Sequence, residues 1–453
     1  MAAQILAICI FVGMFLLIIL DKFERCYITL ASGALVLVLV FGVCMHSMSA
    51  IWGTLNLPSI FTSGFWYGAS EEGNSGINWS TIFFIAGMMI MVEGLGKAGF
   101  FRWLCLTLAK LVRYRIVPLL VCFMVLSAVL SMFIDSITVV LFLATVTLEL
   151  AQTMKFNPIP MILSEVFCAN LGGAATMCGD PPNIIVGTSL GYTFFDFISN
   201  TGVAVAICFV LVLIYFVLCF RKRLLRDEKN SGAAVCPQPG TAITNRPAFL
   251  LSAGVFLLAV ILLATHAQTK LTVACIGVIV AALSLVVIGC TSGGKAVLEI
   301  IKGVDYKTLL FFIGLFVSVA GLKETGVLDV IARFITTVSG GNAAIIVVII
   351  LWISAVTSAF VDNIPFAATM IPVVRSIAAA SGIDMGVLAW ALSLGTDLGG
   401  NATPIGASAN VVGTSVAAKG GYPISWGVYC KYCVGATVLV IAVSMGYLFL
   451  RYL

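Results

Sequence analysis

Two polar, glycine-containing runs each occur twice in this chain, and the copies stand 227 positions apart. SMFIDSI (Ser131 to Ile137) recurs as SAFVDNI (Ser358 to Ile364), and LGGAATMCGDPPN (Leu171 to Asn183) recurs as LGGNATPIGASAN (Leu398 to Asn410). Seven of the thirteen positions in the second pair are identical. Apolar composition alone does not match Asp, Asn, Thr and Gly in one ungapped register. The chain is therefore predicted to contain two copies of one fold.

Composition places both copies in a membrane. Of 453 residues, 61% are hydrophobic and 9% charged, against about 25% charged in a soluble domain. Apolar segments of spanning length recur along the chain at residues 3–20, 27–45, 80–96, 200–220, 247–265, 270–290, 307–322 and 430–450. The predicted fold class is an all-α, multi-pass integral membrane protein with about ten crossings. The lipid bilayer is one expected partner, the plasma or inner membrane is the expected location, and no nucleic-acid partner is expected.

The sequence argues against an enzyme and against a resident cofactor. It contains no G-x-S-x-G, H-E-x-x-H or P-loop motif, and no soluble domain of useful size. Most of its fourteen cysteines lie in apolar spans, where they pack as small hydrophobes. The CxxC pair, Cys430 and Cys433, has no second pair to complete a metal centre.

Counting crossings predicts that the two copies have opposite orientations. If the arms at 117–133 and 137–151 form a re-entrant hairpin, the first copy crosses the membrane five times. An odd number makes the repeats inverted. The predicted division is a first repeat at 1–220, a cytoplasmic linker at 221–246 and a second repeat at 247–453. This topology puts 19 of the 24 Lys and Arg residues on the cytoplasmic side and both termini on the other.

The second duplicated run interrupts an apolar helix in each copy. In hydrocarbon every backbone N–H and C=O must be paired, so a helix unwinds only where it lines a cavity or packs against protein. The ends that a break creates carry partial charges that can hold ions. Conformationally special residues are expected to cause the breaks: Gly172, Gly173, Gly179, Pro181 and Pro182, then Gly399, Gly400 and Gly406. The predicted oxygen ligands nearby are Thr176, Asp180, Asn183, Thr403 and Asn410.

The first duplicated run is expected to form a hairpin tip near the middle of the membrane. An acid at that depth is costly and usually functional. Each tip is expected to meet the broken helix of its own copy, and neither cluster is expected to contain Arg or Lys. The two hypothetical sodium sites are Asp135, Ser136 and Asn183, and Asp362, Asn363 and Asn410. Both tip aspartates also suit helix capping, which is compatible with ion binding.

Two further acids lie inside apolar segments. Glu165 has no acidic mate in the second copy, where Leu392 stands. It is either a proton or sodium carrier or a buried acid paired with a neighbour. Asp397 aligns with Asn170 just before the glycines and is predicted to be an ion ligand.

At these motifs the chain resembles the ion transporter superfamily. The resemblance spans about residues 3–450 and points to the arsenite permease, NhaD-type antiporter and melanosomal P protein branch, related to citrate transporters and divalent-anion/sodium symporters. It rests on GGAATMCGDPPNIIVG, FVDNIPFAATMIPVV and GGNATPIGASANVVGTSV. It implies inverted repeats with re-entrant hairpins and unwound helices, a homodimer and an elevator-like motion. The tips read DSI and DNI where dicarboxylate symporters show Ser-Asn-Thr, which disfavours a dicarboxylate.

The leading functional hypothesis is a secondary active transporter coupled to Na+ or H+ and working by alternating access. Its cargo is a small ion, through Na+/H+ exchange or as an anion such as citrate or arsenite. Oxygen-rich, sulfur-free clusters suit a hard cation. The alternatives are a passive anion channel on the same scaffold and a sodium-coupled dicarboxylate symporter.

Overall fold

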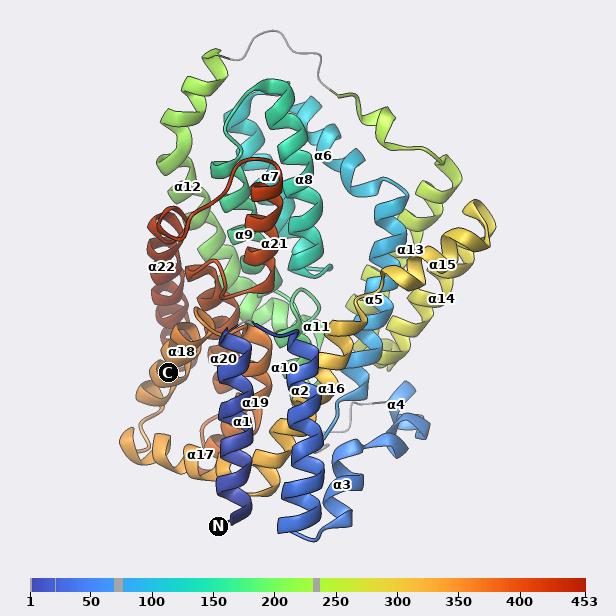
Figure 1. Ribbon diagram of the computed structural model, residues 1–453. Helices are drawn as coiled ribbons and strands as arrows, with labels where there is room; N and C mark the ends of the chain where they lie inside the picture. Colours follow the sequence, from blue (N-terminus) through green and yellow to red (C-terminus); the bar gives the residue numbers. More distant parts are fainter. Residues whose placement is uncertain (1, 21, 69–75, 231–236) are drawn as a thin grey trace.

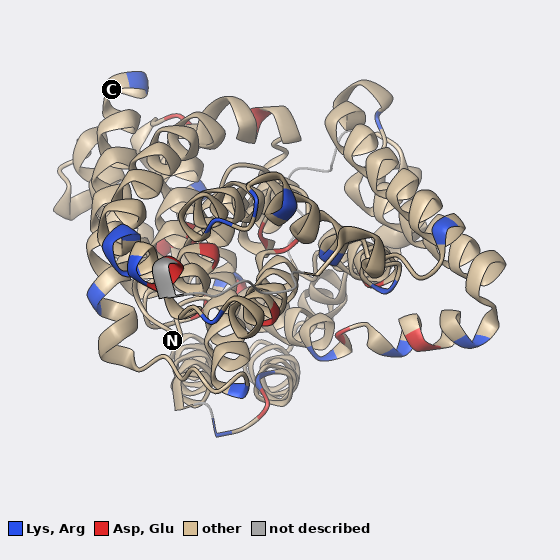
Figure 2. Cartoon of the chain, turned by 90° about the horizontal axis from the view of Figure 1, so that it is seen from above, with Lys and Arg blue, Asp and Glu red and all other residues tan. Residues whose placement is uncertain are grey.

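The computed structural model describes residues 2–20, 22–68, 76–230 and 237–453, and helices make up most of it (Figure 1). Within these residues, ten helical segments are long and apolar enough to cross a membrane. They are α1 (Ala2–Leu20), α2 with η1 (Arg25–Cys44), α5 (Trp79–Lys97), α8 (Ser136–Met154), α11 to α12 (Phe194–Glu228), α13 (Arg246–Thr269), α14 (Val273–Ser292), α16 (Tyr306–Glu324), α19 (Asn363–Ser381) and α22 (Trp426–Tyr452). Seen from above, most of the ribbon is free of charged residues (Figure 2).

The remaining helices are shorter. Those that form the hairpins and broken helices are α7 (Ile116–Ser131), α9 (Ile159–Gly173), α10 (Pro181–Leu190), α18 (Ala343–Ser358), α20 (Met385–Gly399) and α21 (Ser408–Lys419). The others are α3 (Met48–Leu55), η2 (Leu57–Phe61), α4 (Ser63–Trp66), α6 (Phe100–Leu111), η4 (Pro239–Ala242), α15 (Gly294–Gly303), α17 (Val327–Val338) and η5 (Gly400–Ala402).

Both predicted helix breaks are confirmed. Residues 174–180 separate α9 from α10, and residues 400–407 separate α20 from α21. Each break lies beside the turn of a hairpin, α7 with α8 and α18 with α19. In Figure 1 the first hairpin lies in the upper part of the molecule and the second in the lower part, with their turns toward the middle. The inversion of the repeats and the re-entrant course of the hairpins stay predictions.

The second arm of the first hairpin is longer than predicted. We predicted it at residues 137–151, whereas α8 and the matching helix α19 have 19 residues each, or about 28 Å of helix. Both therefore count among the ten segments long enough to span, while the broken helices do not. The number of segments, ten, agrees with the predicted number of crossings. The prediction, however, counted the broken helices and left out the hairpin arms.

The duplication is visible in helix packing outside the hairpins. α5 packs along α14, and α16 packs along α2. A Cβ added to Gly87 of α5 would lie 2.2 Å from the Gly277 oxygen. Position 314, which is 227 residues later, repeats the contact: a Cβ on Gly314 of α16 would lie 2.3 Å from the Thr29 carbonyl carbon. Small residues let these helix backbones touch, as in other membrane bundles.

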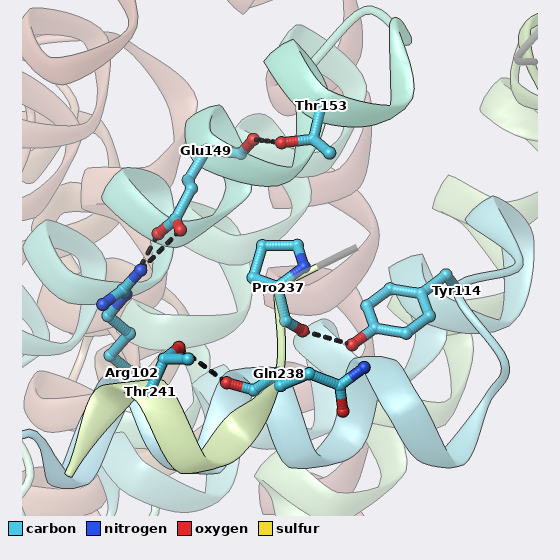
Figure 3. Close-up of polar contacts among 7 residues, drawn as sticks. All are labelled: Arg102, Tyr114, Glu149, Thr153, Pro237, Gln238 and Thr241. Carbon is cyan, nitrogen blue, oxygen red and sulfur yellow. Dashed lines mark hydrogen bonds and ion pairs between the residues drawn. The ribbon is translucent and has the colours of Figure 1, made fainter. Parts of the chain in front are cut away.

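The helix after α5 is α6, which carries Arg102 and Lys110. Arg102 binds the Glu149 carboxylate of α8 with its Nε at 3.1 Å and one terminal nitrogen at 2.6 Å (Figure 3). Just beyond α6, the Tyr114 hydroxyl donates to the Pro237 carbonyl at 2.6 Å, joining this region to the end of the predicted linker. The linker itself is partly helical, because α12 continues to Asn230, and residues 231–236 lie outside the described part.

Candidate functional site

The two hairpin tips carry the predicted capping aspartates. Asp135 accepts a hydrogen bond from the Thr138 backbone N–H at 2.9 Å and another from the Thr138 hydroxyl at 2.8 Å, so it caps α8. Asp362 accepts from the Ile364 N–H at 3.3 Å and caps α19. The capping role is confirmed for both residues. Their role as ion ligands stays a prediction.

Each tip meets the broken helix of its own repeat, as predicted. In the first repeat, the Ser136 hydroxyl donates to Asp180 Oδ1 at 2.7 Å. In the second, the Ser408 hydroxyl donates to Asp362 Oδ2 at 2.7 Å. The carboxylate that accepts this bond lies at the helix break in the first repeat, as Asp180, and at the hairpin tip in the second, as Asp362.

The two clusters are joined rather than separate. The Asn363 side-chain amide, at the tip of the second repeat, donates to Asp180 Oδ2 at 3.2 Å. One carboxylate, 3% exposed, thus receives hydrogen bonds from both hairpin tips. Asp180 also stands at the N-terminus of α10, where Pro181 and Pro182 occupy the first two positions and supply no N–H. The Asp180 side chain accepts no N–H from the first turn of α10, and it accepts hydrogen bonds from the side chains of Ser136 and Asn363 instead.

Three hydrogen bonds in each repeat brace the unwound loop at matching positions. The Thr176 hydroxyl donates to the Met132 carbonyl at 2.5 Å, and Thr403 donates to the Ala359 carbonyl. The Asn183 amide donates to the carbonyls of Gly173 at 3.2 Å and Thr176 at 3.0 Å. The matching Asn410 amide donates to two loop carbonyls at 2.8 Å each. Thr176, Asn183, Thr403 and Asn410 hold the loops in shape, and ion ligation by them stays a prediction.

The side-chain oxygens of Asn183 and Asn410, in the first turns of α10 and α21, accept hydrogen bonds from the opposite repeat. Ser393 of α20 donates to Asn183 Oδ1 at 2.5 Å, and Asn170 of α9 donates to Asn410 Oδ1 at 2.7 Å. Asn170 also donates to Asn401 Oδ1 at 2.9 Å. These contacts tie each unwound loop to the other broken helix.

The glycines at the breaks are required by close backbone contact. A Cβ added to Gly172 would lie 2.1 Å from the Ala128 oxygen of α7, and one added to Gly399 would lie 2.3 Å from the Ala355 Cα of α18. These two contacts again stand 227 residues apart. Added Cβ atoms at the remaining glycines also meet neighbouring atoms within 3.3 Å: Gly173, Gly179, Gly400 and Gly406.

The prediction that neither cluster contains a basic residue is wrong. Arg25, at the start of α2, places one guanidinium nitrogen 2.8 Å from Asp362 Oδ2. The carboxylate side chain is 5% exposed and the arginine 32%. Since Arg25 precedes Asp362 by 337 residues and stands at the end of an apolar segment, no local pattern linked the two. The ion pair joins α2 to the hairpin of the second repeat.

Two buried acids lie away from the tips. The Thr147 hydroxyl donates to Glu165 Oε1 at 2.5 Å, which favours the interpretation of Glu165 as a buried acid paired with a neighbour. Its other oxygen has no hydrogen-bond partner among the described residues. Asp397 is fully buried, and neither of its oxygens has such a partner there. Glu165 as a proton or sodium carrier and Asp397 as an ion ligand stay predictions.

Two cavities approach the site from different directions. One, of about 720 Å³, is lined by Asp135, Asp362, Ser408 and Arg25. The other, of about 780 Å³, is lined by residues such as Thr188, Lys323 and Arg375. The two have no lining residue in common. α10 lies between them, with Ile184 on the first cavity and Ile185 on the second.

Comparison with known proteins places this fold among transporters. A family model described as a citrate transporter matches residues 15–395. An uncharacterized transporter of Mycobacterium tuberculosis is 33% identical over 451 residues, covering 99% of both chains. The P protein of Mus musculus is 28% identical over 450 residues, and the match covers 83% of this chain and 54% of the P protein.

The fold also resembles solved structures. The YdaH transporter of Alcanivorax borkumensis superposes with a TM-score of 0.56 at 15% identity, over 94% of this chain and 96% of that one. MtrF of Neisseria gonorrhoeae, described among antimetabolite efflux pumps, gives a TM-score of 0.54 at 11% identity over 82% and 80% of the two chains. At these identities the likeness is one of fold alone.

Proposed function

The chain belongs to the citrate transporter family, and from that premise we propose that it is a cation-coupled secondary active transporter of a small carboxylate or oxyanion. The observation that carries this proposal is the Asp180 carboxylate, which both hairpin tips bind through Ser136 and Asn363. It adjoins the cavity lined by Asp135 and Asp362. A site built from both repeats can change its access when one moves against the other.

The two cavities support a carrier rather than a channel. A channel needs a continuous pore, whereas here α10 lies between the cavities and they share no lining residue. The cavity that reaches the tips is also lined by Lys22 and Arg25, which the distribution of basic residues assigns to the cytoplasmic side. We therefore propose that this conformation faces inward. The elevator-like motion and the homodimer stay proposals based on the resemblance.

Arg25 supports an anion as cargo. Clusters without basic residues were predicted from the sequence, but the Arg25 guanidinium lies in one of them. A guanidinium presents parallel N–H donors that match a carboxylate or an oxyanion. It now binds Asp362 at the wall of the cavity, where an incoming anion could share or replace that contact.

The coupling cation fits the acidic part of the same site. Carboxylate, amide and hydroxyl oxygens at Asp180, Asn363 and Ser136 are ligands that a hard cation such as Na+ prefers, and a carboxylate can instead take a proton. Binding the cation beside the anion would offset its charge inside the membrane. Na+ and H+ both remain candidates at this point.

The test is uptake of radiolabelled citrate into proteoliposomes, with succinate, phosphate and arsenite tested in parallel. An inward Na+ or H+ gradient should drive accumulation above equilibrium, and an ionophore should abolish it. Asp180→Asn should lose accumulation. The matched control is Asp384→Asn, at the exposed N-cap of α20, because asparagine caps helices as well as aspartate does.

Other outcomes would reject the proposal. A sodium-dependent pH change inside the vesicles without any anion would identify a Na+/H+ exchanger. Anion flux that equilibrates but never accumulates would identify a channel. Equal accumulation by Asp180→Asn and Asp384→Asn would remove Asp180 from the coupling site.

A further inference from the structure

The last turns of α12 (Val203–Asn230) carry a cluster of positive charge. Four basic residues lie within six positions, and all four are exposed: Arg221, Lys222, Arg223 and Arg226. Within the described residues, none of them belongs to an ion pair. The acids that follow, Asp227 and Glu228, are half-buried, and Asp227 accepts a hydrogen bond from the Asn157 N–H at 3.2 Å. The described residues therefore leave most of this positive charge uncompensated.

The same helix has a buried side and an exposed apolar side. One row of residues, spaced four apart, packs inside the protein: Cys208, Val212, Phe216, Phe220 and Leu224. A second row is offset by two residues, or about 200° of turn, and is apolar but 49% to 70% exposed: Val210, Ile214 and Leu218. Because α12 belongs to a segment long and apolar enough to span a membrane, the exposed row faces lipid acyl chains.

The basic residues continue the lipid-facing row. Counting on from Leu218 in steps of four gives Lys222 and Arg226. Residues four apart are neighbours on one side of a helix, so the row changes from apolar to basic within about 6 Å of helix rise. Such a change marks the boundary between acyl chains and headgroups, where Lys and Arg extend their charged ends to the interface. A general excess of cytoplasmic Lys and Arg does not require this register, since residues that face water satisfy it equally.

We propose that the basic end of α12, residues 218–226, binds the headgroup of an anionic phospholipid whose acyl chain lies along Val210, Ile214 and Leu218. The distribution of basic residues assigns this end to the cytoplasmic side, where anionic lipids are concentrated. Each Lys or Arg near the surface favours an anionic lipid by up to about fivefold. A soluble anion lacks the acyl chain that the apolar row contacts.

A lipid bound there contacts a helix that supports the candidate site. α12 packs against α7 of the first hairpin and against α9, which leads into the loop of residues 174–180. Figure 1 shows α12 at the upper left edge of the molecule. The bound lipid therefore ties this group of helices to one leaflet. The inference is independent of the proposed function, because it concerns a lipid and not the cargo.

The first test measures lipid selectivity in phosphatidylcholine membranes that contain the purified protein. Electron paramagnetic resonance of spin-labelled phosphatidylglycerol and of spin-labelled phosphatidylcholine gives the share of each lipid at the protein surface. The wild type should prefer phosphatidylglycerol, and the double variant Lys222→Gln/Arg226→Gln should reduce that preference severalfold. A wild type without the preference overturns the proposal.

The matched control is the double variant Lys155→Gln/Lys419→Gln. It removes two exposed charges, at the ends of α8 and α21, from the same predicted side of the membrane. Ala151, four residues before Lys155, is buried, and α21 is too short to span, so neither lysine continues a lipid-facing row. The control should keep the preference of the wild type. An equal reduction in both double variants overturns the proposal, because total charge would then explain the effect.

The second test needs no variant and so does not depend on the folding of one. Phosphatidylglycerol with a photoactivatable group in its headgroup is added to the wild-type protein, and mass spectrometry locates the adducts after illumination. We expect adducts on residues 218–226. Adducts confined to other segments overturn the proposal, and so does equal labelling of residues 218–226 by phosphatidylcholine that carries the same group. If no anion is transported, the proposed function fails, while both lipid measurements still decide this inference.

Discussion

Replacing Gly172 with alanine tests whether the helix breaks are positioned by backbone contact. The new Cβ would lie 2.1 Å from the Ala128 oxygen, whereas real Cβ contacts are not shorter than 3.0 Å, so α9 must move from α7 by about 0.9 Å. Overpacking of this kind costs about 1–3 kcal/mol, partly offset by up to about 1 kcal/mol from the better helix propensity of alanine. The net destabilisation is expected to be about 1–2 kcal/mol.

The functional effect of Gly172→Ala should exceed its effect on stability. The displaced segment leads directly into the loop that carries Asp180, and a shift of about 1 Å can cost about a hundredfold in rate. Thermal unfolding in detergent and citrate uptake in proteoliposomes measure the two effects. Gly254→Ala in α13 is the matched control, because an added Cβ there meets nothing within 4 Å. If Gly172→Ala transports and melts like Gly254→Ala, the argument from close packing is refuted.

Three further predictions concern the hairpin tips and the residues around them. Arg25→Gln removes a charge-assisted hydrogen bond worth about 1–3 kcal/mol and should raise the KM for an anion. Arg25→Lys keeps the charge and should recover part of the lost affinity. Equal KM values in the wild type and both variants would exclude Arg25 from anion binding. Asp135→Asn and Asp362→Asn should lose coupled transport yet remain folded, since asparagine also caps helices; normal coupling in both would leave them as caps alone. Replacing Pro181 and Pro182 with alanine should reduce transport more than thermal stability, and wild-type transport rates would show that the prolines are dispensable.

The sequence was informative about the site wherever its signals were local. The breaks at residues 174–180 and 400–407 follow from glycine, proline and polar residues in an apolar context, and the capping aspartates follow from their place between two apolar arms. The duplication strengthened these signals because each could be checked at a second position. The contacts of Asn183 and Asn410 with their own loops are the structural counterpart of that repeat.

Contacts between the copies could not be predicted in the same way. The bonds from Asn363 to Asp180 and from Arg25 to Asp362 depend on how helices pack, which no residue spacing encodes. Arm length was also underestimated. We expected the second arm of the first hairpin to end at residue 151, but α8 continues to Met154 and ends at Lys155, whose backbone is left-handed.

The carboxylate of Asp180 has no twin, since Ala407 stands at the matching position. In a carrier with two identical inverted repeats, the states open to the two sides of the membrane would be related by two-fold symmetry and would have equal free energy. Here only the first repeat carries an acid at its helix break, so the two states offer different neighbours to the same solute. Half-saturation concentrations measured from the two faces should therefore differ, although the gradients alone still set the direction of net flow. A kinetic asymmetry of this kind is a property that a single carboxyl group confers on the whole transport cycle.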